Sequence, residues 1–119
     1  MARILVVEPE NAVSDELASA MSLGAHAVSA VRSGREALAW AEKHGSPDVV
    51  VLDLELPDMR PRVVLTALRA RGRRHLPAMF LSRRPRKSLR FGESPVLIAP
   101  FRPTEARAVL DEVFLESGR

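Results

Sequence analysis

The chain has 119 residues, a hydrophobic content of 46% and no cysteine, which is typical of one globular domain stabilised by a core without disulfides. The three histidines lack the spacing of a metal site, and the apolar stretch at the N-terminus is too short for a signal peptide or a membrane span. We therefore expect a cytoplasmic protein without membrane association. The net charge of +3 is uneven, because the segment from Met59 to Gly92 holds eleven basic residues and no acidic residue.

Five short apolar runs, rich in β-branched residues and bounded by turn residues, predict buried strands. In chain order they cover residues 3–7, 25–31, 49–53, 76–81 and 95–99. Helical patterns alternate with them, at residues 13–21, 33–45, 61–72 and 103–114. Gly24 is the expected end of the first helix, and Pro61 suits the first turn of the third. Ser33 and Glu36 form a capping box that opens the second helix.

The stretch between the fourth and fifth strands interrupts this alternation. Residues 83–94 contain Pro85, and their two large apolar residues, Leu89 and Phe91, do not form a stripe. We expect a loop or a single short turn there, so that the helix between these strands is shortened or absent. The regular alternation elsewhere predicts an α/β fold, with a doubly wound, five-stranded parallel sheet and helices on both faces.

Asp53 ends the central apolar run and so lies at the carboxyl end of a strand, the edge at which open parallel sheets bind ligands. Over residues 1–119 the chain resembles the receiver domain of two-component response regulators. The matching features are residues 4–7 followed by acids, residues 33–38, residues 48–59, the strand that ends at Ser82, and Pro100 with Phe101. The resemblance implies one receiver-like domain with the flavodoxin-like strand order 2-1-3-4-5.

Receiver domains accept a phosphoryl group from a histidine kinase on an aspartate, which the resemblance places at Asp53. The transfer needs Mg²⁺, which the family holds with two acids after the first strand, the phosphoacceptor and a backbone carbonyl two residues beyond it. The matching residues are Glu8, Pro9, Asp53 and Glu55. Pro9 has no carboxylate, so one ligand is lost, and Glu8, Asp53 and Glu55 remain as the candidate metal ligands.

Three further positions bear on this chemistry. Ala99 stands where the family has a lysine that neutralises the phosphorylated aspartate, and Val96 stands where it has a switch aromatic. Ser82 keeps the hydroxyl that hydrogen-bonds the phosphoryl group. Because losing one stabilising group typically costs roughly 10²–10³ in rate, the combined losses predict poor phosphotransfer.

We therefore predict an atypical receiver domain that is not an enzyme and has no resident cofactor. It would act as a phosphorylation-independent protein-interaction module in a bacterial signalling or regulatory pathway. Asp53 is then an inherited carboxylate, hydrogen-bonded to Ser82 or to loop amides. The alternative is a residual phosphoacceptor at Asp53, which uses Mg²⁺ in a two-component phosphorelay.

The basic residues after the fourth strand are a separate candidate site for an acidic protein partner or for nucleic acid. They are Arg83, Arg84, Arg86, Lys87 and Arg90. A second group of arginines precedes that strand. The two groups are expected at opposite edges of the sheet, unless the loop after the fourth strand folds back. Val96 and Phe101 are further candidate interaction residues. The last strand and helix commonly form dimer contacts in receivers, so the resemblance also implies a homodimer through these two elements.

Overall fold

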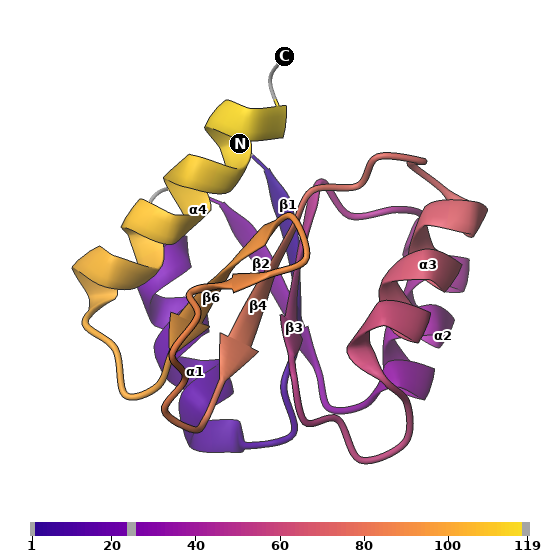
Figure 1. Cartoon of the computed structure of the whole chain (residues 1–119). Coiled ribbons are helices and arrows are strands. Elements are labelled where there is room, and N and C mark those ends of the chain that lie inside the picture. Colours follow the sequence, from indigo (N-terminus) through magenta and orange to yellow (C-terminus); the bar gives the residue numbers. More distant parts are fainter. Residues whose placement is uncertain (1, 24–25, 118–119) are drawn as a thin grey trace.

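The computed structural model describes residues 2–23 and 26–117, in which helices cover both faces of a central sheet (Figure 1). The elements are β1 (Arg3–Val7), α1 (Asn11–Ser22), β2 (Ala27–Val31), α2 (Gly34–His44), β3 (Val49–Asp53), α3 (Pro61–Arg71), β4 (Ala78–Ser82), β5 (Arg90–Phe91), β6 (Ser94–Ile98) and α4 (Pro103–Ser117). Helices α1 and α4 lie on one face of the sheet, and α2 and α3 lie on the other. No helix in these two ranges has both the length and the apolar character that a membrane crossing requires.

The strand order is β2-β1-β3-β4-β6-β5, in which the first five strands are parallel and β5 is antiparallel to β6. Since β6 is the fifth of the predicted strands, the predicted order and the α/β fold class are confirmed. Strand β3 pairs with both β1 and β4, and all five of its residues are buried. Its continuous apolar run follows from this position, because both of its faces pack against helices.

Alternate residues of each central strand serve two separate cores. Val49 and Val51 face the core under α1 and α4, whereas Val50 and Leu52 face the core under α2 and α3. Val96 belongs to the second core and is only 4% exposed. Its prediction as a surface contact residue is therefore wrong, because β6 is covered on that face.

The helix ends follow the predicted signals where the structure describes them. The Glu36 backbone N–H donates to Ser33 Oγ at 3.2 Å, so Ser33 caps α2 as predicted. Pro61 occupies the first turn of α3, where its missing N–H leaves no hydrogen bond unmade. Helix α1 ends at Ser22, and the predicted stop at Gly24 lies outside the described residues.

The join between β4 and β6 is a loop followed by a short antiparallel hairpin. The absence of a helix within residues 83–94 is confirmed, but the two-residue strand β5 was not predicted. Gly92 makes the hairpin turn at a φ of 62°, and Phe91 packs edge-on against Phe80 with ring centroids 4.7 Å apart. The hairpin folds back along β6, which places Arg90 beside Glu112 of α4 at 2.9 Å.

Candidate functional site

The candidate site lies at the carboxyl edge of the sheet, where β1, β3 and β4 end at neighbouring positions. Val7 is in register with Leu52, and Asp53 is in register with Leu81, so Glu8 and Asp53 follow adjacent strands. Both carboxyl groups are enclosed, because Glu8 is 1% exposed and Asp53 is 0% exposed. Buried carboxylates need a cation or several hydrogen bonds, so their partners decide what the site can do.

The guanidinium group of Arg83 enters the site and binds its oxygen atoms. Arg83 Nε lies 2.7 Å from Asp53 Oδ2, and its Nη2 donates to the carbonyl oxygen of Glu55 at 3.0 Å. The same Nε is 3.6 Å from Glu8 Oε2, and Nη1 is 3.9 Å from Glu10 Oε1. One cation thus connects the segments that follow β1, β3 and β4.

These contacts involve the oxygen groups that the receiver resemblance assigns to Mg²⁺, namely those of Glu8, Asp53 and the Glu55 carbonyl. The site as built does not fit a divalent cation, because the Arg83 guanidinium already hydrogen-bonds Asp53 and the Glu55 carbonyl and lies 3.6 Å from Glu8 Oε2. Pro9 also supplies no carboxylate at the position of the second acid. Over residues 2–23 and 26–117, no three histidine or acidic side chains are grouped closely enough to hold a metal ion.

Glu8 balances the charge of the site by holding a proton. Burial, and then the neighbouring Asp53, raise the pKa of Glu8 to about 8, against an ordinary value of 4.5. Its Oε2 accepts a hydrogen bond from the Glu10 backbone N–H at 2.7 Å, while Oε1 has no partner among the described atoms. A single guanidinium compensates a single carboxylate, so the raised pKa favours a neutral Glu8 beside the Arg83–Asp53 ion pair.

Ser82 does not face Asp53, which corrects the prediction of a hydrogen bond between them. Ser82 Oγ donates to the Arg84 carbonyl at 2.7 Å and accepts from the Arg84 N–H at 3.1 Å. The alternative prediction of a loop amide is confirmed, because the Glu55 N–H donates to Asp53 Oδ1 at 2.5 Å. The physical reason is that Arg83 satisfies Asp53 Oδ2 and leaves the hydroxyl free to close the turn after β4.

The loop after β3 is fixed to the start of α2 by Asp58. Its two carboxylate oxygens accept hydrogen bonds from the backbone N–H groups of Gly34 and Arg35, both at 2.9 Å. Burial opposes ionisation, but these hydrogen bonds prevail and lower the pKa of Asp58. Gly34 allows this contact, because a Cβ at that position would lie 2.8 Å from Met59 Sδ. The Glu55 carbonyl that faces Arg83 therefore belongs to a restrained loop.

The basic residues after β4 do not form one surface. Arg84 pairs with Glu55 at 3.0 Å and Arg90 with Glu112, while Arg86 donates to the Ser88 carbonyl at 3.2 Å. The loop after β4 does fold back, so Arg90 points toward α4 and away from Arg83. Binding of an acidic partner or nucleic acid by the whole group stays a prediction, although three of its five cations already have carboxylate partners.

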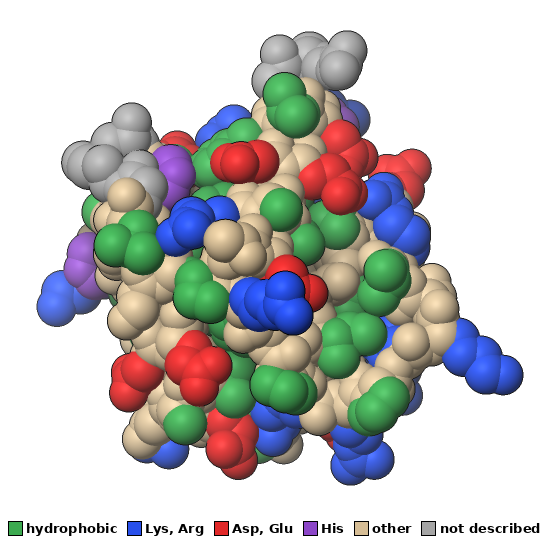
Figure 2. All heavy atoms as spheres, turned by 90° about the vertical axis from the view of Figure 1, so that its left-hand side faces the viewer, with side chains coloured by type: hydrophobic (Ala, Val, Ile, Leu, Met, Phe, Trp, Pro, Cys, Tyr) green, Lys and Arg blue, Asp and Glu red, His purple; other side chains and the backbone are tan. Residues whose placement is uncertain are grey.

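Ala99 and Phe101 lie beside β6 and carry no charge. The Ala99 N–H donates to the Ser82 carbonyl at 2.8 Å, so the position joins β6 to β4 without offering a cation to Asp53. Phe101 is half-buried against the core under α1 and α4. Figure 2 shows that hydrophobic, acidic and basic side chains are interspersed on the face that carries these helices. A homodimer through β6 and α4 remains a prediction.

Sequence reasoning missed the role of Arg83, which it assigned to the basic residues after the fourth strand. A signal for its inward position was nevertheless present. Pro9 and Ala99 remove a metal ligand and a lysine, so Asp53 needs another counter-charge, and Arg83 is the first cation after the adjacent strand.

The comparisons with known proteins bear on the family and the fold of the chain. The model of the response regulator receiver domain matches residues 4–105. Response regulator protein FleR of Pseudomonas aeruginosa is 32% identical over 117 residues, which is 94% of this chain and 24% of that protein. Transcriptional regulatory protein PcoR of Escherichia coli is 32% identical over 110 residues, or 88% of this chain and 48% of that protein.

The chain thus spans from about a quarter to about a half of these curated relatives. Among solved structures, the chemotaxis response regulator CheY4 of Vibrio cholerae superposes with a TM-score of 0.83 at 24% identity. That match covers 95% of this chain and 98% of the other, and it bears on the fold alone. The chain belongs to the response regulator receiver domain family.

Proposed function

We propose that this receiver domain acts as a phosphorylation-independent protein-interaction module in a two-component signalling pathway. The observation that carries the proposal is the Arg83 guanidinium, which binds the phosphoacceptor position Asp53 and the oxygens that would hold a metal ion. The module would interact with a protein partner, and we expect it to act in the cytoplasm.

The surroundings of Asp53 support a site that does not react. An attacking carboxylate needs a free oxygen, but Oδ2 bonds to Arg83 and Oδ1 accepts the Glu55 N–H. The carboxylate is also fully buried, so a phosphodonor reaches it only after the ion pair opens. Ala99 offers no charge to a phosphorylated aspartate, and Arg83 would have to leave its present partners to do so.

The ion pair between Arg83 and Asp53 also links the segments of the carboxyl edge. Arg83 connects the segments after β1, β3 and β4, while Asp58 attaches the loop after β3 to α2. The edge therefore needs no phosphoryl group or metal ion to be ordered. This arrangement favours a partner that recognises the unphosphorylated domain over a partner that binds only after phosphorylation. Since PcoR is named a transcriptional regulatory protein, we further propose that the pathway regulates transcription.

The proposal is tested by treating the protein with a small-molecule phosphodonor, acetyl phosphate, and Mg²⁺, followed by intact-mass measurement. We expect the wild-type mass to stay unchanged, as it does in the Asp53→Asn variant, which lacks the nucleophile. A gain of one phosphoryl group on most wild-type molecules, absent in Asp53→Asn, would contradict the proposal. The chain would then be a phosphoacceptor of a two-component phosphorelay.

A further inference from the structure

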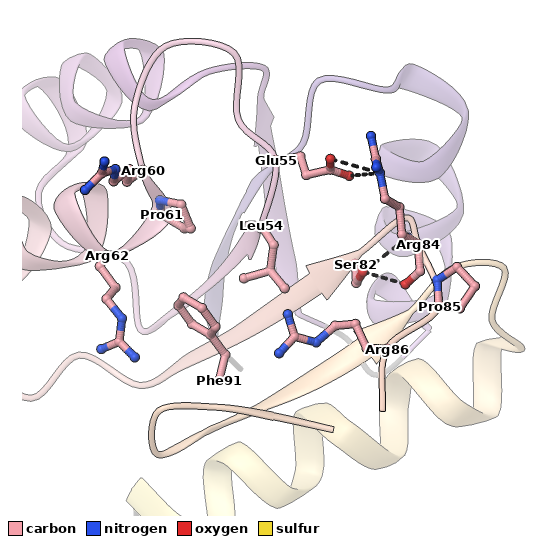
Figure 3. Close-up of a pocket in the computed structure, with 10 residues that line it drawn as sticks. All are labelled: Leu54, Glu55, Arg60, Pro61, Arg62, Ser82, Arg84, Pro85, Arg86 and Phe91. Carbon is pink, nitrogen blue, oxygen red and sulfur yellow. Dashed lines mark hydrogen bonds and ion pairs between the residues drawn. The ribbon is translucent and has the colours of Figure 1, made fainter. Parts of the chain in front are cut away.

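A pocket of about 480 Å³ lies next to the Asp53 site, between the loop after β3, the start of α3 and the segment after β4 (Figure 3). Its apolar wall consists of Leu54, Pro61, Pro85 and Phe91. The polar and charged residues around this wall are Glu55, Arg60, Arg62, Ser82, Arg84 and Arg86. The volume lies within the range of small-molecule sites, roughly 300–1,000 Å³.

Two of these arginines are held in place by the same aromatic ring. The guanidinium carbon of Arg62 lies 4.6 Å from the centroid of the Phe91 ring, and that of Arg86 lies 5.9 Å from it. Figure 3 shows the two guanidinium groups on either side of Phe91. Gly92 makes room for this arrangement, since a Cβ there would lie 3.0 Å from Arg62 Nη2. The cations are therefore positioned before any ligand arrives.

The positive charge of the pocket exceeds its negative charge. Among the described residues, Glu55 is the one acidic residue that lines it, and Glu55 already pairs with Arg84. Arg60 and Arg62 make no ion pair with a carboxylate of the described residues, and the polar contacts of Arg86 are to backbone carbonyls. An apolar cavity with uncompensated guanidinium groups complements an anion that carries an apolar body.

We propose that this pocket binds a small organic carboxylate with an aromatic or branched apolar body. The body packs against Leu54, Pro61 and Phe91, and the carboxylate accepts hydrogen bonds from Arg62 and Arg86. The inference goes beyond the proposed function and does not depend on it, because no lining contact requires Asp53 to be phosphorylated or unphosphorylated.

The test is a ¹⁵N–¹H NMR titration with three probes: 2-naphthoate, its neutral isostere 2-naphthamide, and acetate, which lacks the apolar body. We expect 2-naphthoate to cause saturable shifts in the amides of Leu54, Arg62 and Phe91, with a dissociation constant of about 1 mM or below. The amide and acetate are expected to bind at least about tenfold more weakly, since each lacks one of the two interactions.

Variants assign the binding to the guanidinium groups. Arg62→Gln and Arg86→Gln are each expected to weaken 2-naphthoate binding by about fivefold to tenfold. Arg74→Gln is the matched control, because Arg74 is an exposed arginine that does not line the pocket. Its affinity is expected to equal that of the wild type. The amide spectrum of each variant shows whether it is folded.

Several results would overturn the proposal. Equal affinity for 2-naphthoate and 2-naphthamide would show that charge plays no part. Shifts centred outside the pocket, or unchanged affinity in both pocket variants, would place the binding elsewhere. An acidic peptide with one aromatic residue that binds more than about tenfold tighter than 2-naphthoate, at the same amides, would make the pocket a protein-docking site instead.

Discussion

The Asp53 site and the adjacent pocket lie side by side at the carboxyl edge of the sheet, yet they use arginine in opposite ways. In the Asp53 site one guanidinium contacts oxygens from the ends of two strands and from a loop, so its charge is compensated and the site is closed. In the pocket, Arg60 and Arg62 make no ion pair with a carboxylate of the described residues, and the cavity is open. Residues 83–86 contribute arginines to both sites. Whether the charge of an arginine is compensated depends on the carboxylates that lie near it.

Charge has a structural role in the Asp53 site and a binding role around the pocket. Breaking a buried ion pair leaves a charge without compensation, whereas removing an exposed cation costs little stability. Changes in the Asp53 site should therefore alter the free energy of unfolding, and changes around the pocket should alter ligand binding. Three predictions test this division, from the largest expected effect to the smallest.

The largest effect is expected for the pH dependence of stability that Glu8 creates. Its pKa is about 8 in the folded protein and 4.5 ordinarily, so the folded state keeps a proton that the unfolded chain releases. The contribution of Glu8 to the free energy of unfolding is thus highest below pH 4.5 and falls as the pH rises to about 8. Glu8→Gln, which cannot ionise, should be more stable than the wild type by on the order of 3–5 kcal/mol at about pH 9.

Urea unfolding of both proteins at several pH values measures this difference. The stability advantage of Glu8→Gln should disappear below pH 4.5, where both states of the wild type carry the proton. Glu16→Gln, at an exposed position of α1, is the matched control and should follow the wild type. A constant difference between Glu8→Gln and wild type at every pH would contradict this prediction, because it would show that folding does not shift the pKa of Glu8.

The second prediction compares two neighbouring arginines that both pair with carboxylates. Arg83→Met removes the cation from two buried carboxyl groups and should lower the free energy of unfolding by about 3 kcal/mol at neutral pH. Arg84→Met removes a partner of Glu55 in a pair whose arginine side chain is 77% exposed, and should cost about 0.5 kcal/mol or less. Equal losses in chemical denaturation would show that Arg83 is no more structural than its neighbour.

The third prediction compares two glycines with positive φ, Gly92 at 62° and Gly45 at 83°. Alanine at either position should cost about 1 kcal/mol, because a side chain disfavours this backbone conformation. Only at Gly92 would the new Cβ approach Arg62, whereas nothing lies within 4 Å at Gly45. Gly92→Ala should therefore also weaken 2-naphthoate binding, and Gly45→Ala should not. NMR titration of both variants decides whether the hairpin positions Arg62.

Most of the fold could be predicted from the sequence, because the local signals for strands and helix starts agree with the tertiary structure. The β-branched run of β3 predicts a strand covered on both faces, and its residues are buried. Ser33 and Pro61 mark the starts of α2 and α3, because each satisfies or removes an orphan N–H. Strand β5 was missed because two residues carry no periodicity, and its pairing depends on the turn at Gly92.

The candidate site was predicted only in part, because side-chain direction depends on tertiary contacts. The receiver resemblance placed Glu8 and Asp53 in one metal site, and the structure brings both carboxyl groups to the same edge of the sheet, within reach of Arg83. The direction of Ser82 was wrong, and the entry of Arg83 was missed. Both errors concern the turn at the end of β4, residues 82–84, where no periodic pattern fixes the direction of a side chain. The one signal for Arg83 was the missing counter-charge of Asp53.

The most direct test of the central claim is paramagnetic line broadening by Mn²⁺ in wild type and Arg83→Ala. If the Arg83 guanidinium holds the position of a metal ion, wild-type amides near Glu8 and Asp53 should show no selective broadening at about 1 mM Mn²⁺. In Arg83→Ala, the freed oxygens of Glu8, Asp53 and Glu55 should bind Mn²⁺, and broadening should centre on those amides. Selective broadening of the same amides in wild type, at the same Mn²⁺ concentration as in the variant, would contradict the account.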